Sequence, residues 1–121
     1  MLIDTTTLRH NLSRSDWVVF DCRHDLADSR RGARVYREGH LPGAYFAPVE
    51  TELSGAKTGA NGRHPLPDAA GFAAFLNAHG VTAETQIVAY DDVAAELGIK
   101  VVHLRDDVCP SYPNDCERIF R

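Results

Sequence analysis

The sequence has no long apolar run, few cysteines and no excess of basic residues. Its first ten residues, MLIDTTTLRH, hold too short an apolar stretch for a signal peptide, and no segment approaches the length of a transmembrane span. We therefore expect a cytoplasmic protein that does not bind membranes. The formal net charge of -4 leaves no basic footprint, so nucleic acid is not an expected partner.

The cysteine content argues against both a disulfide framework and a metal site. The number of cysteines is odd and their spacing is irregular: they are Cys22, Cys109 and Cys116. Thiols also stay reduced in the cytoplasm. Cys109 and Cys116 together with His103 match no standard zinc spacing. We expect no metal and no cofactor. A Ser-His-Asp site has no support beyond the presence of the three residue types.

The remaining pattern predicts one small α/β domain. The length of 121 residues, with 44% hydrophobic and 25% charged residues, suits one globular core. Helices alternate with strands of β-favouring residues, which predicts a mainly parallel sheet flanked by helices. The expected helices begin at Asp4 or Thr5, span 30–38, and begin again at Asp68; the expected strands are 17–21, 44–46, 86–90 and 101–104.

Three segments resemble the rhodanese family of sulfurtransferases, and in particular the first domain of its two-domain members. They are Asp21-Cys22-Arg23, the run EGHLPGA at 38–44, and the loop that contains LSG at 53–55 and GANGRHPLPD at 59–68. The resemblance covers residues 1–92, whereas 93–121 form a divergent segment with a weak helix at 93–97 and a polar tail. We expect a rhodanese-like domain that is incomplete at its C-terminal end.

The motif residues have structural interpretations of their own. Asp21 and Arg23 follow a buried strand and are expected to pair and fix the next loop, at the strand ends where α/β sheets bind ligands. Pro42 and Gly43 suit a tight turn. His40 is expected to brace that turn by hydrogen bonds. Cys22, just before Arg23, is interpreted as a small buried hydrophobe.

The family's chemistry requires an accessible thiolate that takes a sulfane sulfur from thiosulfate or 3-mercaptopyruvate and passes it to cyanide or a thiol. The resemblance implies that this cysteine belongs to the second domain and that the first domain has an acidic residue at the equivalent place, here Asp91. Cys109 is the alternative nucleophile. Pro110 and Pro113 each remove a backbone donor beside it and Asp115 adds negative charge, which argues against a thiolate there.

The long loop supplies one further hypothesis. Arg63 and His64 are candidates for contact with an anionic sulfur donor or with a second domain, and the alternative is a surface loop pinned by Pro65 and Pro67.

Three functions remain open from the sequence. The chain is the non-catalytic first domain of a thiosulfate or 3-mercaptopyruvate sulfurtransferase, or a rhodanese-scaffold binding or regulatory module, or a small active sulfurtransferase that uses Cys109. In the first case a small-molecule sulfur donor is a partner only once a catalytic domain completes the site. A covering layer is expected to be missing, through an early stop or an altered reading frame, and a homodimer would cover the exposed apolar surface.

Overall fold

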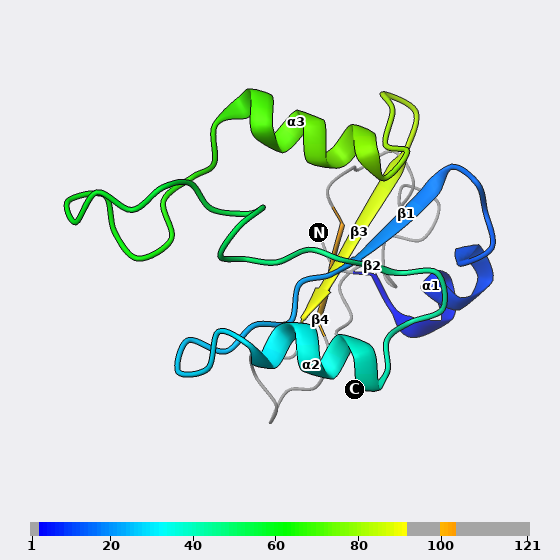
Figure 1. Ribbon diagram of the computed structural model, residues 1–121. Coiled ribbons are helices and arrows are strands. Elements are labelled where there is room, and N and C mark those ends of the chain that lie inside the picture. Colours follow the sequence, from blue (N-terminus) through cyan, green and yellow to red (C-terminus); the bar gives the residue numbers. More distant parts are fainter. Residues whose placement is uncertain (1–2, 92–99, 104–121) are drawn as a thin grey trace.

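The computed structural model describes residues 3–91 and, as backbone, 100–103. Figure 1 shows the elements in chain order: α1 (Thr5–Asn11), β1 (Trp17–Asp21), α2 (Arg31–Glu38), β2 (Tyr45–Phe46), α3 (Ala69–Ala78), β3 (Gln86–Asp91) and β4 (Lys100–His103). The predicted helices and strands are present in this part of the chain. The predicted helix at 93–97 and the polar tail lie outside the described residues.

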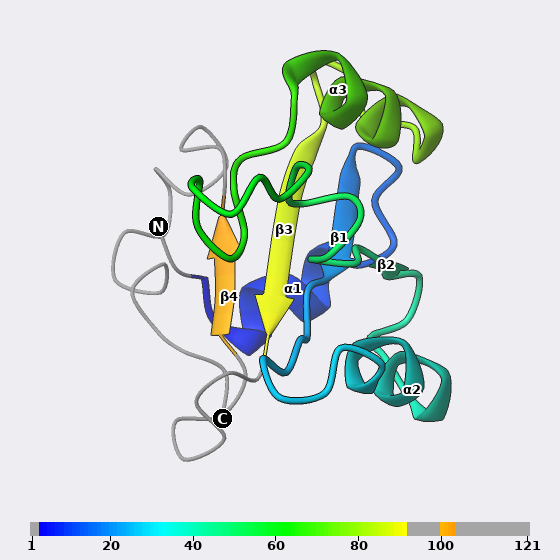
Figure 2. The same ribbon diagram turned by 60° about the vertical axis from the view of Figure 1, so that its left-hand side comes forward.

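One sheet with the strand order β2-β1-β3-β4 organises the fold (Figure 2). β1 pairs in parallel with both neighbours, and Trp17 lies opposite Gln86. β4 pairs antiparallel with β3, with Lys100 opposite Asp91. The prediction of an α/β fold with a mainly parallel sheet is confirmed.

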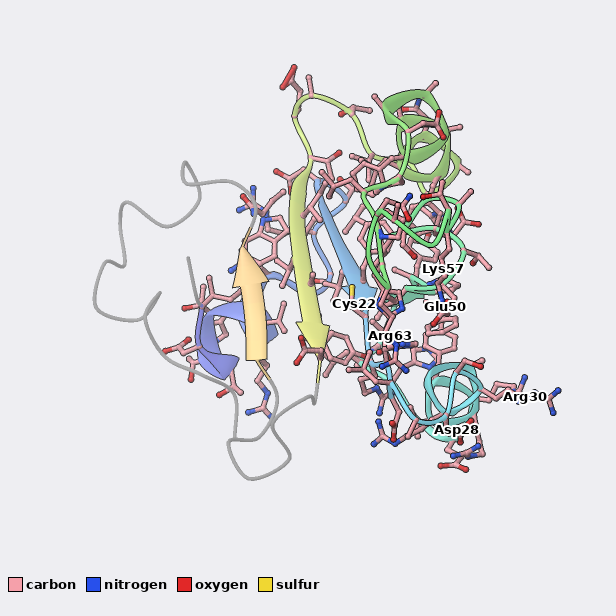
Figure 3. The ribbon with its side chains drawn as sticks, turned by 90° about the vertical axis from the view of Figure 1, so that its left-hand side faces the viewer. Cys22, Asp28, Arg30, Glu50, Lys57 and Arg63 are labelled. Carbon is pink, nitrogen blue, oxygen red and sulfur yellow. The ribbon has the colours of Figure 1, made fainter. Side chains whose placement is uncertain are left out.

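β1 is buried on both faces, as its unbroken apolar sequence predicts. All five of its residues are buried. Trp17 and Val19 pack with Leu8 of α1 on one face, and Val18 and Phe20 join the cluster on the other. Figure 3 shows α1 on one side of the sheet and α3, α2 and the long loop on the other. Both faces of β1 are therefore covered.

The packing under α3 is looser. Phe75 and Leu76 contact the sheet cluster, yet no residue of α3 is fully buried. An apolar cavity of ≈ 160 Å³ separates α3 from β1 and β3. The packing of α3 on the sheet is therefore incomplete, whereas the layer expected to be missing after residue 92 concerns residues that lie mostly outside the described ones.

Side-chain caps and glycines set the helix limits as predicted. Asp4 accepts a hydrogen bond from Thr7 N at 2.7 Å, and Asp68 accepts one from Gly71 N at 3.0 Å, which satisfies free amides of each first turn. Gly80 follows α3 with φ +76°, a conformation that favours glycine. None of the helices within the described ranges has the length and hydrophobicity that a bilayer crossing requires.

Candidate functional site

Asp21 and Arg23 form a buried ion pair where β1 ends. Asp21 is fully buried, and its Oδ2 lies 2.6 Å from Arg23 Nη2. The main-chain N–H of Arg23 also donates to Asp21 Oδ1 at 3.0 Å. The predicted pair is present, and it fixes the chain as it leaves the strand.

The pair extends into a network that joins four segments. Tyr90 Oη of β3 donates to Asp21 Oδ2 at 2.9 Å and accepts from Leu41 N at 3.1 Å. Arg23 Nη2 donates to the carbonyl oxygen of Gly39, just after α2. Burial raises the pKa of Tyr90, an effect that the hydrogen bond from Leu41 opposes and the hydrogen bond to Asp21 reinforces. The network is a structural junction at the strand ends.

The turn after α2 also has structural contacts. Gly43 has φ +77°, and Ala44 N donates to Leu41 O at 3.0 Å across Pro42. His40 stacks on Tyr36, with ring centroids 3.8 Å apart, and its Nδ1 lies 2.8 Å from Tyr36 O. His40 therefore braces the last turn of α2. We expected it to brace the turn at Pro42 and Gly43, which follows directly.

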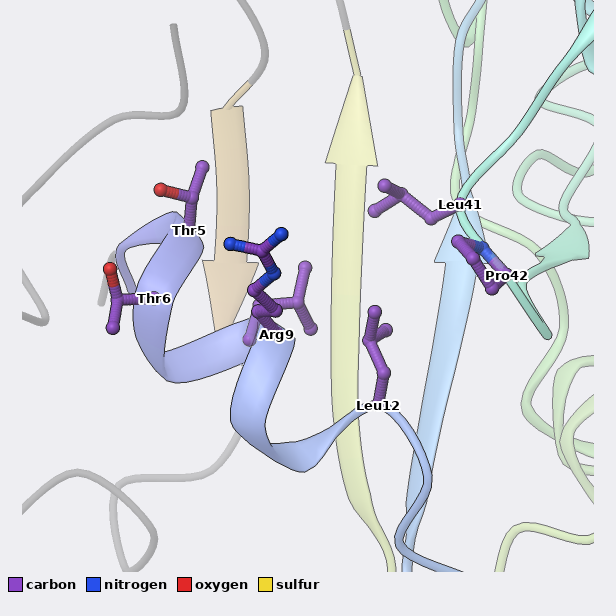
Figure 4. A pocket seen from close by; sticks show the side chains of 7 residues that line it. Thr5, Thr6, Arg9, Leu12, Leu41 and Pro42 are labelled. Atoms are coloured by element: carbon purple, nitrogen blue, oxygen red, sulfur yellow. The ribbon is translucent and has the colours of Figure 1, made fainter.

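A hollow of ≈ 390 Å³ lies between α1 and this turn (Figure 4). Its walls, from Thr5, Leu8, Arg9, Leu12 and Leu41 among others, present aliphatic groups, hydroxyls and one guanidinium. No thiol or imidazole of the described residues lines it. It offers a surface for packing and no group for sulfur chemistry.

Cys22 is the single cysteine among the described residues, and its environment suppresses the thiolate. Its side chain lines the apolar cavity under α3 with Phe20 and Ile87. Burial, followed by the nearby carboxylates of Asp21 and Asp91, raises the pKa of Cys22 to about 12. The thiol is therefore protonated at neutral pH. Cys22 acts as a small apolar side chain that is partly buried, less enclosed than the buried position expected from the sequence.

Asp91 is the last residue of β3, at the edge where a parallel sheet presents its ligand site. It lies close enough to Cys22 to disfavour a second negative charge there. A carboxylate at this place accepts no sulfur and repels anionic donors. Cys109 and Cys116 lie outside the described residues.

The long loop (residues 47–68) is attached to the segment after β1. Arg63 Nη2 donates to the carbonyl oxygen of Leu26 at 2.6 Å, and its side chain is otherwise at the surface. Leu26 and Leu66 are 59% and 91% exposed. The guanidinium of Arg63 thus lies accessible beside the uncovered Leu26.

His64 belongs to a group that the sequence does not reveal. Its Nε2 lies 2.9 Å from Glu50 Oε1, and His24 Nε2 lies 3.7 Å from the same oxygen. Lys57 Nζ lies 3.2 Å from Glu50 Oε2. The hydrogen bonds from His64 and Lys57 lower the pKa of Glu50. His24 and Glu50 were missed because only the folded loop brings positions 24, 50 and 64 together.

Parallel strands with helices on both faces define an α/β domain. The sequence model of the rhodanese-like domain family matches residues 4–104. The chain belongs to that family. The match continues past residue 92, where the recognisable motifs stop.

Curated relatives carry sulfurtransferase names. The chain is 48% identical over 92 residues to a probable 3-mercaptopyruvate sulfurtransferase of Pseudomonas aeruginosa, covering 75% of the chain and 32% of that protein. It is 38% identical over 124 aligned positions to a putative thiosulfate sulfurtransferase, SseB, of Mycobacterium tuberculosis, covering 93% of the chain and 43% of that protein.

A solved structure supports the same fold. The 3-mercaptopyruvate sulfurtransferase from Leishmania major matches with a TM-score of 0.68 and 30% identity, over 79% of this chain and 26% of that one. The chain thus spans less than half the length of each of these proteins.

Proposed function

We propose that this chain is the non-catalytic first domain of a cytoplasmic thiosulfate or 3-mercaptopyruvate sulfurtransferase, whose sulfur-carrying cysteine belongs to a second domain. The observation that carries the proposal is the strand edge itself. It ends in Asp91, and its one described thiol, Cys22, is held protonated by burial and two carboxylates. The names of the relatives and the short share of their length that the chain spans support the same assignment.

The chemistry explains why a second domain is needed. A thiolate attacks the outer sulfur of thiosulfate, a new S–S bond forms, and sulfite leaves with the electron pair of the broken bond. The resulting persulfide gives its outer sulfur to cyanide, which yields thiocyanate and regenerates the thiolate. Each step needs an accessible thiolate near positive charge, and the partly buried Cys22 beside Asp21 and Asp91 offers the reverse.

Complementation tests the proposal. The purified chain is mixed with the separately produced catalytic domain of a two-domain relative, and thiocyanate formation is followed with thiosulfate and then with 3-mercaptopyruvate. Turnover above that of the catalytic domain alone is the expected result. Turnover by the chain alone, with one added sulfur located on Cys109 by mass spectrometry, would contradict the proposal.

Arg63 is the residue of this domain best placed to meet the anionic donor or the second domain. Its guanidinium is accessible beside the exposed Leu26. Replacing the corresponding arginine by alanine in a full-length relative is expected to weaken donor affinity or domain association. Unchanged values of both would remove Arg63 from the proposal.

The exposed Leu26 also favours a second candidate, a binding or regulatory module that uses the surface around Arg63 to contact another protein. Large exposed apolar side chains beside a guanidinium are typical of protein interfaces. The complementation experiment separates the two: tight binding of the catalytic domain without added turnover favours the module.

A further inference from the structure

Three groups with the chemistry of metal ligands converge where the long loop meets the segment after β1. His24 comes from that segment, and Glu50 and His64 come from the two arms of the loop. One ligand atom of each lies within 4.8 Å of the other two. Figure 3 shows Glu50 and Lys57 on this side of the sheet, beside Arg63.

The histidines are partly shielded and one nitrogen has an unmet hydrogen-bonding capacity. The side chains of His24, His64 and Glu50 are 11%, 20% and 33% exposed. Within the described part of the chain, the buried Nε2 of His24 makes no hydrogen bond. A buried polar nitrogen without a partner is destabilising, and a metal ion would use its lone pair.

We propose that His24, Glu50 and His64 bind a divalent transition-metal ion, with Zn²⁺ as the best match. Two imidazoles and one carboxylate form an established ligand set for Zn²⁺. In a tetrahedral site with Zn–N and Zn–O distances near 2 Å, ligand atoms stand roughly 3.3 Å apart. The separations of 2.9 and 3.7 Å to Glu50 Oε1 bracket this value.

The surroundings define what kind of site this is. Three protein ligands leave a fourth position, and the partial exposure of Glu50 and His64 lets water fill it. Lys57 holds the other carboxylate oxygen of Glu50, which orients Oε1 toward the histidines but places a positive charge near the ion. Hard cations such as Mg²⁺ and Ca²⁺ prefer oxygen ligands and are not expected to bind.

The bound ion would fasten the long loop to the end of β1. Glu50 and His64 bracket residues 51–63, which contain Gly59 and Gly62 at positive φ and Lys57 and Arg63 as trypsin sites. Coordination by His24 would hold Glu50 and His64, which flank this segment, against the chain that follows β1. Zn²⁺ is therefore expected to slow tryptic cleavage at the two sites.

The binding test uses the full chain with Cys109→Ser and Cys116→Ser, because those thiols are the competing zinc ligands. Zn²⁺ affinity is measured by competition with a chromophoric chelator, and Co²⁺ is added to record the visible absorption of a four-coordinate site. The expected result is one ion per chain. His24→Phe and Glu50→Gln should each weaken binding by more than about a hundredfold, beyond what loss of an outer-shell contact costs.

Two further variants control the test. His10→Asn, at an exposed histidine of α1, should leave affinity unchanged. Lys57→Gln removes a positive charge and should raise affinity roughly three- to tenfold, which a purely structural His–Glu–His contact does not predict. Far-UV circular dichroism establishes that each variant is folded.

Absence of binding to the folded serine variant would overturn the proposal, as would binding that survives in Glu50→Gln. If His24→Phe does not fold, Glu50→Gln and Lys57→Gln decide the question. Zn²⁺-dependent protection from trypsin must disappear in His24→Phe and in Glu50→Gln. The site does not depend on the proposed sulfurtransferase role, since metal affinity and complementation are measured separately.

Discussion

Removing Arg23 is the sharpest test of the junction at the strand ends. Asp21 is fully buried, and Arg23, 15% exposed, supplies its compensating charge. Arg23→Ala leaves a buried carboxylate with the hydroxyl of Tyr90 as its remaining side-chain donor. Breaking a buried ion pair from one side costs about 3–5 kcal/mol, a large share of the about 5–15 kcal/mol of a typical domain.

The assay follows the fluorescence of Trp17, the one tryptophan of the chain, through urea unfolding. It is buried in the core on β1, the strand that also carries Asp21, so its emission reports loss of the sheet. The matched control is Arg14→Ala, because Arg14 and Asp16 pair at 2.7 Å with both side chains about half exposed. Its expected cost is small, because solvent screens an exposed pair.

Two outcomes would refute this reasoning. One is an Arg23→Ala variant within about 1 kcal/mol of the parent, since that is the size of an exposed pair. The other is an equal loss in Arg14→Ala, which would mean that burial does not distinguish the two pairs. Asp21→Asn should cost less stability than Arg23→Ala. It leaves Arg23 without its carboxylate, but that guanidinium is 15% exposed and still donates to the carbonyl oxygen of Gly39, whereas Arg23→Ala leaves a fully buried anion.

The other predictions concern close packing, alkaline pH and helix capping. Gly32→Ala should destabilise the chain by more than about 1 kcal/mol, because a Cβ there would lie 2.4 Å from the carbonyl oxygen of Arg23. Urea unfolding measures this loss of stability. Stability should fall above pH 9.0, since the folded pKa of Cys22 is raised from 9.0 to about 12 and the unfolded chain then releases its proton first. The loss is about 1 kcal/mol over the first pH unit, and Cys22→Ala should remove it. Asp68→Ala should cost about 1 kcal/mol by removing the cap on Gly71 N, seen as a lower thermal midpoint.

Each of these has a clear contrary result. A neutral Gly32→Ala would mean that α2 can move away from β1 at little cost. An alkaline slope that persists in Cys22→Ala would assign it to another group, and Tyr90, whose pKa is also raised, would be examined next. An unchanged midpoint in Asp68→Ala would mean that water satisfies the first turn of α3 equally well.

Local signals made most of the fold predictable. The unbroken run from Trp17 to Asp21 specified a strand buried on both faces, and Asp68 and Gly80 bounded α3 because capping depends on residues within one helical turn. The pairing of Asp21 with Arg23 was predictable for the same reason, as two positions along the chain suffice to bring them together.

The rest depended on folding over long separations. Tyr90 joins Asp21 from 69 positions away, and no periodicity signals such a contact. The approach of His24, Glu50 and His64 depends on the path of an irregular loop, which turn residues constrain only piece by piece. The partial burial of α3 was also not predictable, because a stripe of apolar residues indicates which face of a helix packs on the sheet and not how closely it packs.

The parallel pairing of β1 with β3 has a consequence for synthesis on the ribosome. Trp17 pairs with Gln86, so the partner strand is made 69 residues later. At about 5–20 residues per second, β1 waits roughly 3–14 s for it. During that time the edge of β1 that faces β3 has unpaired backbone groups, and the packing of α3 on the strand also comes late, because α3 is the last element made before β3. Association of nascent chains should therefore be greatest in this interval and should decline once residue 91 has been added.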